Sequence, residues 1–326
     1  MERGHPFPPA VGRSLECASV RPTAGGKGGP RSIKVDTRGG IVYHWEQVSI
    51  RKVLMSTLTV LFFGDVVGRP GRAGLAQAIP ELRAKHNADF IVVNGENAAS
   101  GSGLTPSTLN KILTSGADVV TTGDHIFRNK EFPGVIHELR VLRPANYPKT
   151  ADGKGWGLYT TRAGVRIVVM NLMGRVFMEP LRCPFEIADE ILTGASNQAR
   201  IILVDMHGEA TSEKIAMGWH LDGRVSALVG THTHVQTADE RILPQGTAYI
   251  TDLGMTGPYD SVLGREKAPV LKKLRTAMPA HFDVAEHDIK ACGVIVKIDA
   301  ETGRAQSIER FQLPIELRTG VDYGKS

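Results

Sequence analysis

Short runs of consecutive apolar residues recur along the chain from residue 58, and a polar or glycine-containing break follows each run. Apolar runs of about four to eight residues bounded by turn signals are typical of buried strands. This pattern predicts strands over 58–63, 90–93, 118–122, 201–204 and 225–229.

Segments with apolar residues three or four positions apart lie between these runs and predict helices. One of them opens at Thr105 and Pro106, residue types favoured at the N-cap and the first helical position. The other predicted helices cover 72–86, 130–140, 184–192, 211–219 and 266–276.

Strands that alternate with helices indicate an α/β fold with parallel strands. Two further pairs of apolar runs, 158–161 with 165–171 and 292–298 with 305–311, are separated by short turns and predict hairpins. The hairpins suggest a second, mixed sheet that packs against the first.

The first 54 residues contain eight Gly and five Pro and show little apolar periodicity. This composition predicts a disordered N-terminal extension, or one that is not native, over 1–54. Met55 stands directly before the first predicted strand, so we expect translation to start there and a single domain to cover 55–326.

The whole chain carries a net charge of +5 and has a pI of about 9.1, which is typical of nucleic-acid binders. Residues 1–55 hold nine Lys and Arg against four Asp and Glu, so all of that excess lies in this segment. The body of the chain is therefore neutral, and nucleic-acid binding is not favoured.

Cys17, Cys183 and Cys292 are widely spaced and odd in number, which argues against a disulfide framework and for a cytoplasmic protein. The chain has no apolar run of the roughly 18 residues needed to span a membrane.

Potential metal ligands stand where the predicted strands end. In an extended backbone, residues i and i+2 point to the same side, so His232 and His234 are expected to converge on one site. Ligands of α/β proteins gather at the carboxyl ends of parallel strands. The polar residues at these ends are Asp65, Glu96, Asn97, Asp124, His125, His207, His232 and His234.

This set of oxygen and nitrogen donors contains no thiolate, which suits manganese, iron or zinc. It has more members than one tetrahedral zinc requires. Two metal ions that share a carboxylate use the set more fully, and such pairs catalyse phosphoryl transfer.

Five short motifs occur in a fixed order: GDVVG at 64–68, NGEN at 94–97, GDH at 123–125, DMHGE at 205–209 and GTHTH at 230–234. Together they resemble the motifs of the calcineurin-like metallophosphoesterases. More narrowly, they resemble the YmdB-like family of bacterial 2′,3′-cyclic-nucleotide phosphodiesterases. The resemblance extends from about residue 58 to residue 312.

The resemblance implies a four-layer α/β/β/α sandwich and a role for each strand-end residue. Asp65, Asn97 and His234 would hold one metal ion. Asp124, His207 and His232 would hold the other, and Glu96 would bridge the two. His125 would protonate the leaving oxygen as general acid. The ions would be divalent or trivalent, iron or manganese before zinc.

The implied reaction is in-line attack of a metal-bound hydroxide on a small phosphodiester, such as a 2′,3′-cyclic nucleotide. A phosphomonoesterase or nuclease on the same metals is the first alternative. A regulator that binds RNA or a partner protein and hydrolyses weakly is the second. The resemblance also implies a homo-oligomer.

The chain departs from the family pattern at Asp124, where the family usually has Asn. The extra negative charge is expected to bind metal more tightly. Other interpretations stay open at this stage: Asp65 as a helix cap, Glu96 and Asn97 as turn formers, and His125 as a further metal ligand. Arg69 and Arg175 are weaker candidates for contact with the substrate phosphate.

Overall fold

The computed structural model describes residues 33–35, 41–43 and 57–317. The chain divides into two units, Met1–Val53 and Leu54–Ser326. The described part of the first unit is an antiparallel pair, β1 (Ile33–Val35) and β2 (Ile41–Tyr43). Apart from these strands, the predicted extension over 1–54 and the expected start at Met55 lie outside the described residues.

The second unit contains two sheets. In the larger sheet, β3, β5, β6 and β7 run parallel, whereas β15 is antiparallel to β3. Its strand order is β4 (Asp65–Val66), β14 (Met255–Pro258), β15 (Ile289–Asp299), β3 (Thr57–Phe63), β5 (Phe90–Asn94), β6 (Val119–Thr121) and β7 (Val141–Leu142), with β16 (Ala305–Pro314) paired to β15.

The smaller sheet has four parallel strands in its centre and an antiparallel strand at each edge. Its order is β12 (Arg241–Ile242), β13 (Ala248–Ile250), β11 (Ala227–Thr231), β10 (Ile201–His207), β9 (Arg166–Met173) and β8 (Trp156–Thr160). The β8–β9 pair confirms the first predicted hairpin.

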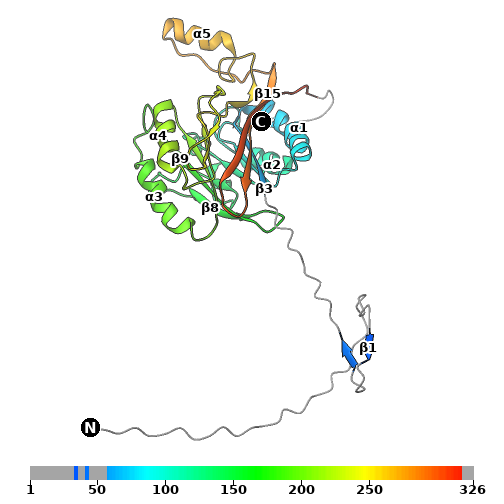
Figure 1. Ribbon diagram of the computed structural model, residues 1–326. Helices are drawn as coiled ribbons and strands as arrows, with labels where there is room; N and C mark the ends of the chain where they lie inside the picture. Colours follow the sequence, from blue (N-terminus) through cyan, green and yellow to red (C-terminus); the bar gives the residue numbers. More distant parts are fainter. Residues whose placement is uncertain (1–32, 36–40, 44–56, 318–326) are drawn as a thin grey trace, which may run out of the picture. The chain divides into compact units, whose positions relative to one another are not determined.

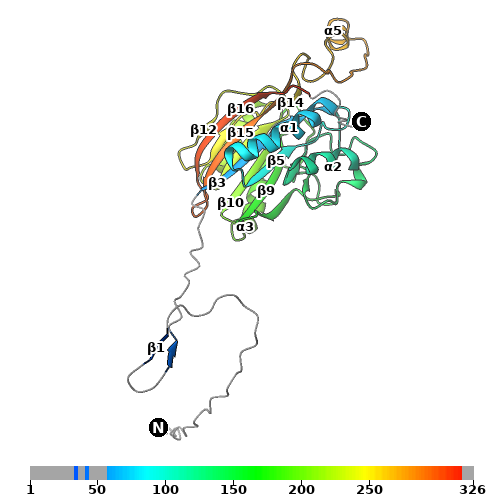
Figure 2. The same ribbon diagram turned by 90° about the vertical axis from the view of Figure 1, so that its right-hand side faces the viewer.

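Helices cover the outer face of each sheet. α1 (Gly68–His86) and α2 (Pro106–Ser115) lie on one side of the strands in Figure 1, and α3 (Pro184–Ala195) and α4 (Thr211–Leu221) lie on the other. The view in Figure 2 brings α1 and α2 to the front. A further helix, α5 (Lys267–Thr276), follows β14.

Side-chain alternation along single strands builds the layers. In β3, Leu61 and Phe63 pack with the core under α1 and α2, whereas Val60 and Phe62 pack between the two sheets. Successive strand residues point to opposite faces, so one strand contributes to two cores. β10 does the same, with Leu203 in the core between the sheets and Val204 under α3 and α4. The predicted four-layer α/β/β/α sandwich is therefore confirmed.

Two sequence predictions are wrong. The helix predicted over 130–140 is a single 3₁₀ turn, η1 (Phe132–Gly134), flanked by other turns. Pro133 has no backbone N–H and excludes the carbonyl of a preceding helical turn, which explains the break. The closing hairpin, β15–β16, exists but joins the first sheet beside β3 instead of a second sheet.

The start of α2 follows the prediction closely. The Thr105 hydroxyl accepts the backbone N–H of Thr108, and the Thr108 hydroxyl accepts the backbone N–H of Thr105. This reciprocal capping satisfies backbone donors that a helix leaves free at its first turn.

Within the described residues, none of the helices combines the length and the apolar character that crossing a membrane requires.

Candidate metal centre

The carboxyl ends of the parallel strands of both sheets carry the eight predicted site residues. Each residue has a hydrogen bond or close ion pair to at least one other member of the set. They are Asp65 at the start of β4, Glu96 and Asn97 after β5, Asp124 and His125 after β6, His207 at the end of β10, and His232 and His234 after β11.

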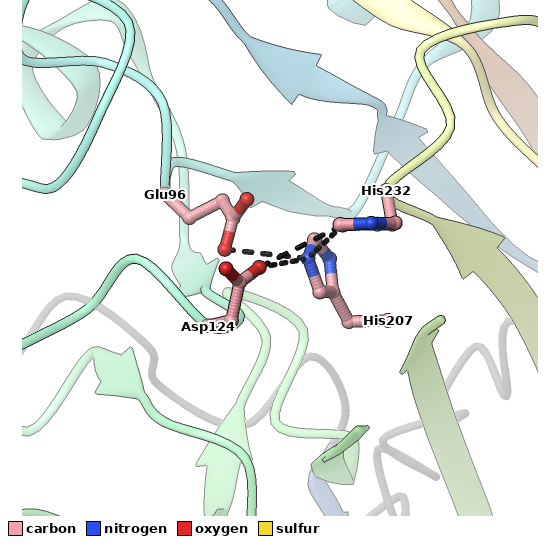
Figure 3. A group of neighbouring side chains, drawn as sticks. All are labelled: Glu96, Asp124, His207 and His232. Carbon is pink, nitrogen blue, oxygen red and sulfur yellow. Dashed lines mark hydrogen bonds and ion pairs between the residues drawn. The ribbon is translucent and has the colours of Figure 1, made fainter. Parts of the chain in front are cut away.

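Four of these side chains form an inner group, shown in Figure 3, in which the potential ligand atoms of Glu96, Asp124, His207 and His232 lie within 4.8 Å of one another. His207 Nε2 lies at the centre, 3.3 Å from Glu96 Oε2 and 3.5 Å from Asp124 Oδ1. His232 Nδ1 is 3.0 Å from the same nitrogen. Four donors that face one point are the arrangement a bound cation needs.

Asp65, Asn97 and His234 form a second group beside the first. Asn97 Nδ2 lies 3.2 Å from His234 Nε2, and Asp65 Oδ1 lies 4.0 Å from that nitrogen. Glu96 stands between the groups, because its Oε1 accepts a hydrogen bond from Asn97 Nδ2 at 3.0 Å while its Oε2 faces His207. One carboxylate thus reaches both groups with different oxygens.

Two buried oxygens without hydrogen-bond partners indicate that the donor set fits a metal ion. Among the described residues, Asp65 Oδ1 and Asp124 Oδ1 are buried oxygens with no hydrogen-bond partner. Buried carboxylate oxygens are costly unless a donor or a cation compensates them. Cations placed among these oxygens and imidazole nitrogens would satisfy both orphan atoms.

The buried carboxylates give the site an electrostatic field that favours a bound cation or proton. Burial raises the pKa of Asp65 to about 8, against the opposing charge of His207. Burial also acts on Glu96, but the nearby imidazoles of His207 and His125 hold its pKa well below the ordinary value. The carboxylates outweigh burial at His207 and raise its pKa, whereas burial and the charge of His207 lower the pKa of His232 to about 4.

Hydrogen bonds behind the ligands orient two of the rings. The Thr231 hydroxyl donates to Asp205 Oδ1 at 2.7 Å and so accepts from His207 Nδ1 at 2.9 Å, which leaves His207 Nε2 free to face Glu96. His234 Nδ1 lies 3.1 Å from the backbone oxygen of Leu263, which leaves its Nε2 for the second group. Such partners fix the tautomer and direction of metal-binding imidazoles.

The backbone around His232 and His234 differs from the prediction. β11 ends at Thr231, and the two histidines have φ angles of 102° and 65°, so they are not on extended backbone. The turn directs His232 to the inner group and His234 to the second group. The prediction from i, i+2 spacing on a strand is therefore wrong, although both rings do enter the site.

A buried ion pair supports this turn. Asp252 Oδ2 accepts the Lys214 ammonium at 2.8 Å and the backbone N–H of Thr233 at 3.1 Å. Asp65 Oδ2 accepts the backbone N–H of His232 at 3.1 Å. Lys214 and Asp252 were not predicted. A lysine in a helix carries no local sign of this contact, whereas Asp252 follows a parallel strand, the position that identified the other site residues.

His125 lies at the edge of both groups and is partly exposed. Its Nδ1 is 3.0 Å from Asn97 Oδ1 and 3.1 Å from Glu96 Oε1, and its Nε2 is 3.4 Å from Asp124 Oδ2. These contacts are compatible with a proton donor and with an additional ligand, so its role remains a prediction.

Asp124, the departure from the family pattern, has a nearby compensating charge. Arg128 Nη2 lies 3.0 Å from Asp124 Oδ2, four residues further along the chain. This arginine was not among the predicted site residues, and it offsets part of the added negative charge.

Contact of Arg69 and Arg175 with the substrate phosphate stays a prediction. Arg69 pairs with Glu286 at 2.7 Å on the surface, and the described contact of Arg175 is its backbone N–H with Glu213. A cavity of about 260 Å³ over the metal ligands is lined instead by Arg265, together with Gly101 and Leu263. Arg265 donates to the backbone oxygens of Ser100 and Gly101 and so holds the loop that contains these two residues at this cavity.

Comparison with known proteins agrees with this geometry. The family model described as "YmdB-like protein" matches residues 61–311. The chain is 48% identical over 255 residues to the 2′,3′-cyclic-nucleotide 2′-phosphodiesterase of Bacillus subtilis (strain 168), and the match covers 78% of this chain and 96% of that protein.

Two solved structures have the same fold. A hypothetical protein from Thermus thermophilus is 38% identical with a TM-score of 0.73, and the match covers 79% of this chain and 99% of that one. A novel phosphatase from Mycoplasma pneumoniae is 31% identical with a TM-score of 0.75, and the match covers 80% and 94%.

Proposed function

The chain belongs to the YmdB-like protein family, and on that premise we propose that it hydrolyses small phosphodiesters, 2′,3′-cyclic nucleotides in particular, at a two-metal centre. The observation that carries this proposal is the pair of adjacent donor groups that share Glu96. The 48% identity with a 2′,3′-cyclic-nucleotide 2′-phosphodiesterase supports the choice of substrate.

Each donor group would hold one ion. Asp65, Asn97 and His234 form one set, Asp124, His207 and His232 form the other, and Glu96 contributes to both. Oxygen and nitrogen donors without sulfur suit iron or manganese, with zinc as the alternative. When bound, two such ions activate water near neutral pH and stabilise the charge that develops on the phosphate.

His125 would protonate the leaving 2′ oxygen. Asn97 Oδ1 and Glu96 Oε1 hold the ring through Nδ1, and Nε2, which lies 3.4 Å from Asp124 Oδ2, would be the atom that delivers the proton. The leaving alkoxide needs this proton, and imidazole is the most frequent donor in such steps. Its partial exposure gives the ring access to a bound substrate.

Arg265 would act on the substrate indirectly. Its guanidinium lines the cavity over the metal ligands and holds the backbone of Ser100 and Gly101. We expect it to set the shape of that side of the cavity.

Phosphomonoester hydrolysis on the same ligands is the second candidate, supported by the likeness to the Mycoplasma pneumoniae phosphatase. Comparing hydrolysis of 2′,3′-cyclic AMP with that of adenosine 3′-monophosphate separates the two functions, because a phosphomonoesterase releases inorganic phosphate from the second compound.

Metal content per chain and hydrolysis of 2′,3′-cyclic AMP, measured on wild type and His125→Ala, test the main proposal. We expect about two metal ions per chain in both proteins and a roughly 100- to 10,000-fold lower kcat in the variant, the usual contribution of a general acid. His137→Ala, which changes an exposed histidine, is the matched control and should retain full activity.

Loss of metal together with activity in His125→Ala would make His125 a ligand instead of the acid. A wild-type protein that binds no metal and hydrolyses no phosphodiester would contradict the proposed function.

A further inference from the structure

A second cavity of about 710 Å³ opens beside the inner metal group. Asp124 and His232 form part of its wall, so it is continuous with the proposed reaction site. The remaining wall holds three aromatic rings, those of Phe127, Tyr147 and Phe177, together with Met178 and Pro180 and the charged side chains of Arg128 and Glu179. Its volume lies in the range of roughly 300–1,000 Å³ that is typical of small-molecule sites.

Phe177 is the most unusual residue of this wall. It is 89% exposed, which makes it the most exposed of the large hydrophobic side chains in the described part of the chain. Its backbone has a φ of 63°, in the left-handed region that non-glycine residues rarely adopt. A phenylalanine in this state gains almost nothing from burial, so packing within the chain does not explain it.

Hydrogen bonds to Glu213 hold the segment that carries Phe177. The buried Glu213 carboxylate accepts the backbone N–H of Arg175 at 3.0 Å and that of Val176 at 3.2 Å. Gly174 completes this anchor, because a Cβ at its position would lie 2.5 Å from Glu213 Oε2. The backbone that precedes the exposed Phe177 ring is therefore anchored to Glu213.

Another part of the cavity wall is rigid as well. Phe127 packs edge-to-face against both Tyr147 and Phe132, with ring centroids 5.2 Å apart in each pair. Tyr147 is 9% exposed, so its ring is held by packing. The cavity thus combines the packed rings of Phe127 and Tyr147 with one ring left open to solvent.

We propose that this cavity binds the nucleobase of the cyclic nucleotide, with the ring of Phe177 stacked on the base. The inference rests on the proposed function, which places the phosphate at the metal ligands Asp124 and His232. A base attached to that phosphate through ribose needs a planar apolar surface nearby, and aromatic side chains stack on every base through its π-face.

Arg128 adds a charge suited to the same ligand. Its guanidinium lines the cavity, is 59% exposed and pairs with Asp124, so it lies where the cavity meets the metal ligands. A cation there favours an anionic phosphate over a neutral ligand.

A larger cavity of about 890 Å³ fits the base less well. Its wall includes charged side chains, among them Arg69, Glu266 and Glu286, and one phenylalanine, Phe282, whereas the cavity beside the inner metal group has three phenylalanine or tyrosine rings. None of the eight predicted site residues lines it. It offers one phenylalanine ring, and it adjoins the candidate ligands only through Arg265, which also lines the 260 Å³ cavity over them.

Steady-state kinetics on two substrates test the proposal. The first is 2′,3′-cyclic AMP, and the second is the 2′,3′-cyclic phosphate of methyl riboside, which has the same reacting ring and no base. Phe177→Ala should raise KM for 2′,3′-cyclic AMP by about tenfold with kcat unchanged, as expected for the loss of one stacking contact. The variant should hydrolyse the base-free substrate as the wild type does.

Two further variants sharpen this result. Phe177→Tyr keeps a stacking ring and should restore the wild-type KM. Leu139→Ala removes another exposed apolar side chain, 66% exposed and away from this cavity, and should change neither substrate's kinetics. Affinity for adenosine 3′-monophosphate, measured by calorimetry, should fall by about tenfold in Phe177→Ala and provides a readout independent of turnover.

Equal KM changes on both substrates, or no change on either, would overturn the base site while leaving the proposed function intact. Hydrolysis of neither substrate by the wild type would contradict the proposed function, and the calorimetric comparison would then decide the base site alone. Equal affinity of wild type and Phe177→Ala for adenosine 3′-monophosphate would overturn it.

Discussion

At the scale of single residues, the site depends on atoms behind the ligands as much as on the ligands. His207 can present Nε2 to Glu96 and Asp124 because its Nδ1 is engaged by the Thr231 hydroxyl. That hydroxyl is directed in turn by Asp205, which is buried. Burial raises the pKa of Asp205, and hydrogen bonds from Thr121 and Thr231 oppose that rise.

Thr231→Val tests this chain of contacts, since valine keeps the shape of threonine and removes the hydroxyl. His207 would lose the acceptor that sets its ring, and Asp205 would lose a donor. We expect metal affinity to fall by about 10- to 100-fold, the usual cost of losing such a partner. Competition with a chelator of known affinity measures it.

Thr193→Val, on the exposed face of α3, is the control and should keep wild-type affinity. Unchanged affinity in Thr231→Val would show that the hydroxyl does not orient His207.

At the scale of elements, the site exists because several strands end together and the chain turns sharply at each end. Gly123 follows β6, and a Cβ at this position would lie 2.2 Å from both Glu96 Oε2 and His207 Nε2. Glycine is thus required here by close approach to the ligands. Glycine is also required at Gly230 within β11, where a Cβ would lie 1.8 Å from the backbone oxygen of Thr251.

Gly123→Ala should place a methyl group among the inner ligands and displace Glu96 or His207. We expect metal content per chain to fall well below that of the wild type and phosphodiesterase activity to fall with it. Elemental analysis and circular dichroism together check the result, because the spectrum of the folded chain should persist.

Gly194→Ala in α3 is the matched control, since a Cβ at this position would meet no atom within 4 Å and alanine favours helices by about 0.5–1 kcal/mol over glycine. This variant should keep its metal and unfold at the same or a higher temperature. Full metal content in Gly123→Ala would contradict the steric argument.

At the scale of the whole molecule, α5 stands apart from the four layers in both views (Figures 1 and 2). Within α5, Val270 is the buried residue, whereas Leu271 and Leu274 are 51% and 75% exposed. Met278 beyond its end is 58% exposed. A helix of this length is marginal without packing. We therefore expect α5 to form a contact between chains if the homo-oligomer that the resemblance implies exists.

Replacing Leu271 and Leu274 together by Glu should therefore reduce the oligomer to single chains, because two buried charges oppose an apolar contact. Light scattering coupled to size exclusion measures the mass. Leu139→Glu adds a charge at another exposed leucine and should leave the mass unchanged. An unaltered mass in the double variant, or a wild-type protein that is already a single chain, would contradict the prediction.

Much of the fold follows from local patterns. The apolar runs at β3, β5, β10 and β11 and the capping residues of α2 identify the alternating elements, and parallel strands of this kind bring their ends to one edge. The helix predicted over 130–140 is wrong because Pro133 interrupts the segment that has helical spacing. The position of the β15–β16 hairpin, with β15 beside β3, was not predictable, because either sheet could have accepted that hairpin.

The sequence by itself determined which side chains end the parallel strands, and within one sheet the residues that end adjacent parallel strands must meet. The packing of the two sheets, which brings His207 and His232 against Glu96 and Asp124, belongs to the tertiary structure. Only the tertiary structure decided how the site residues divide into two groups around Glu96, because left-handed turns at His232 and His234 send the two rings to different neighbours. It also placed Phe177 at the rim of a cavity beside the ligands. The succession of strands and helices along the chain depends on local periodicity, whereas ring directions depend on contacts between residues more than 100 positions apart, such as Asn97 with His234.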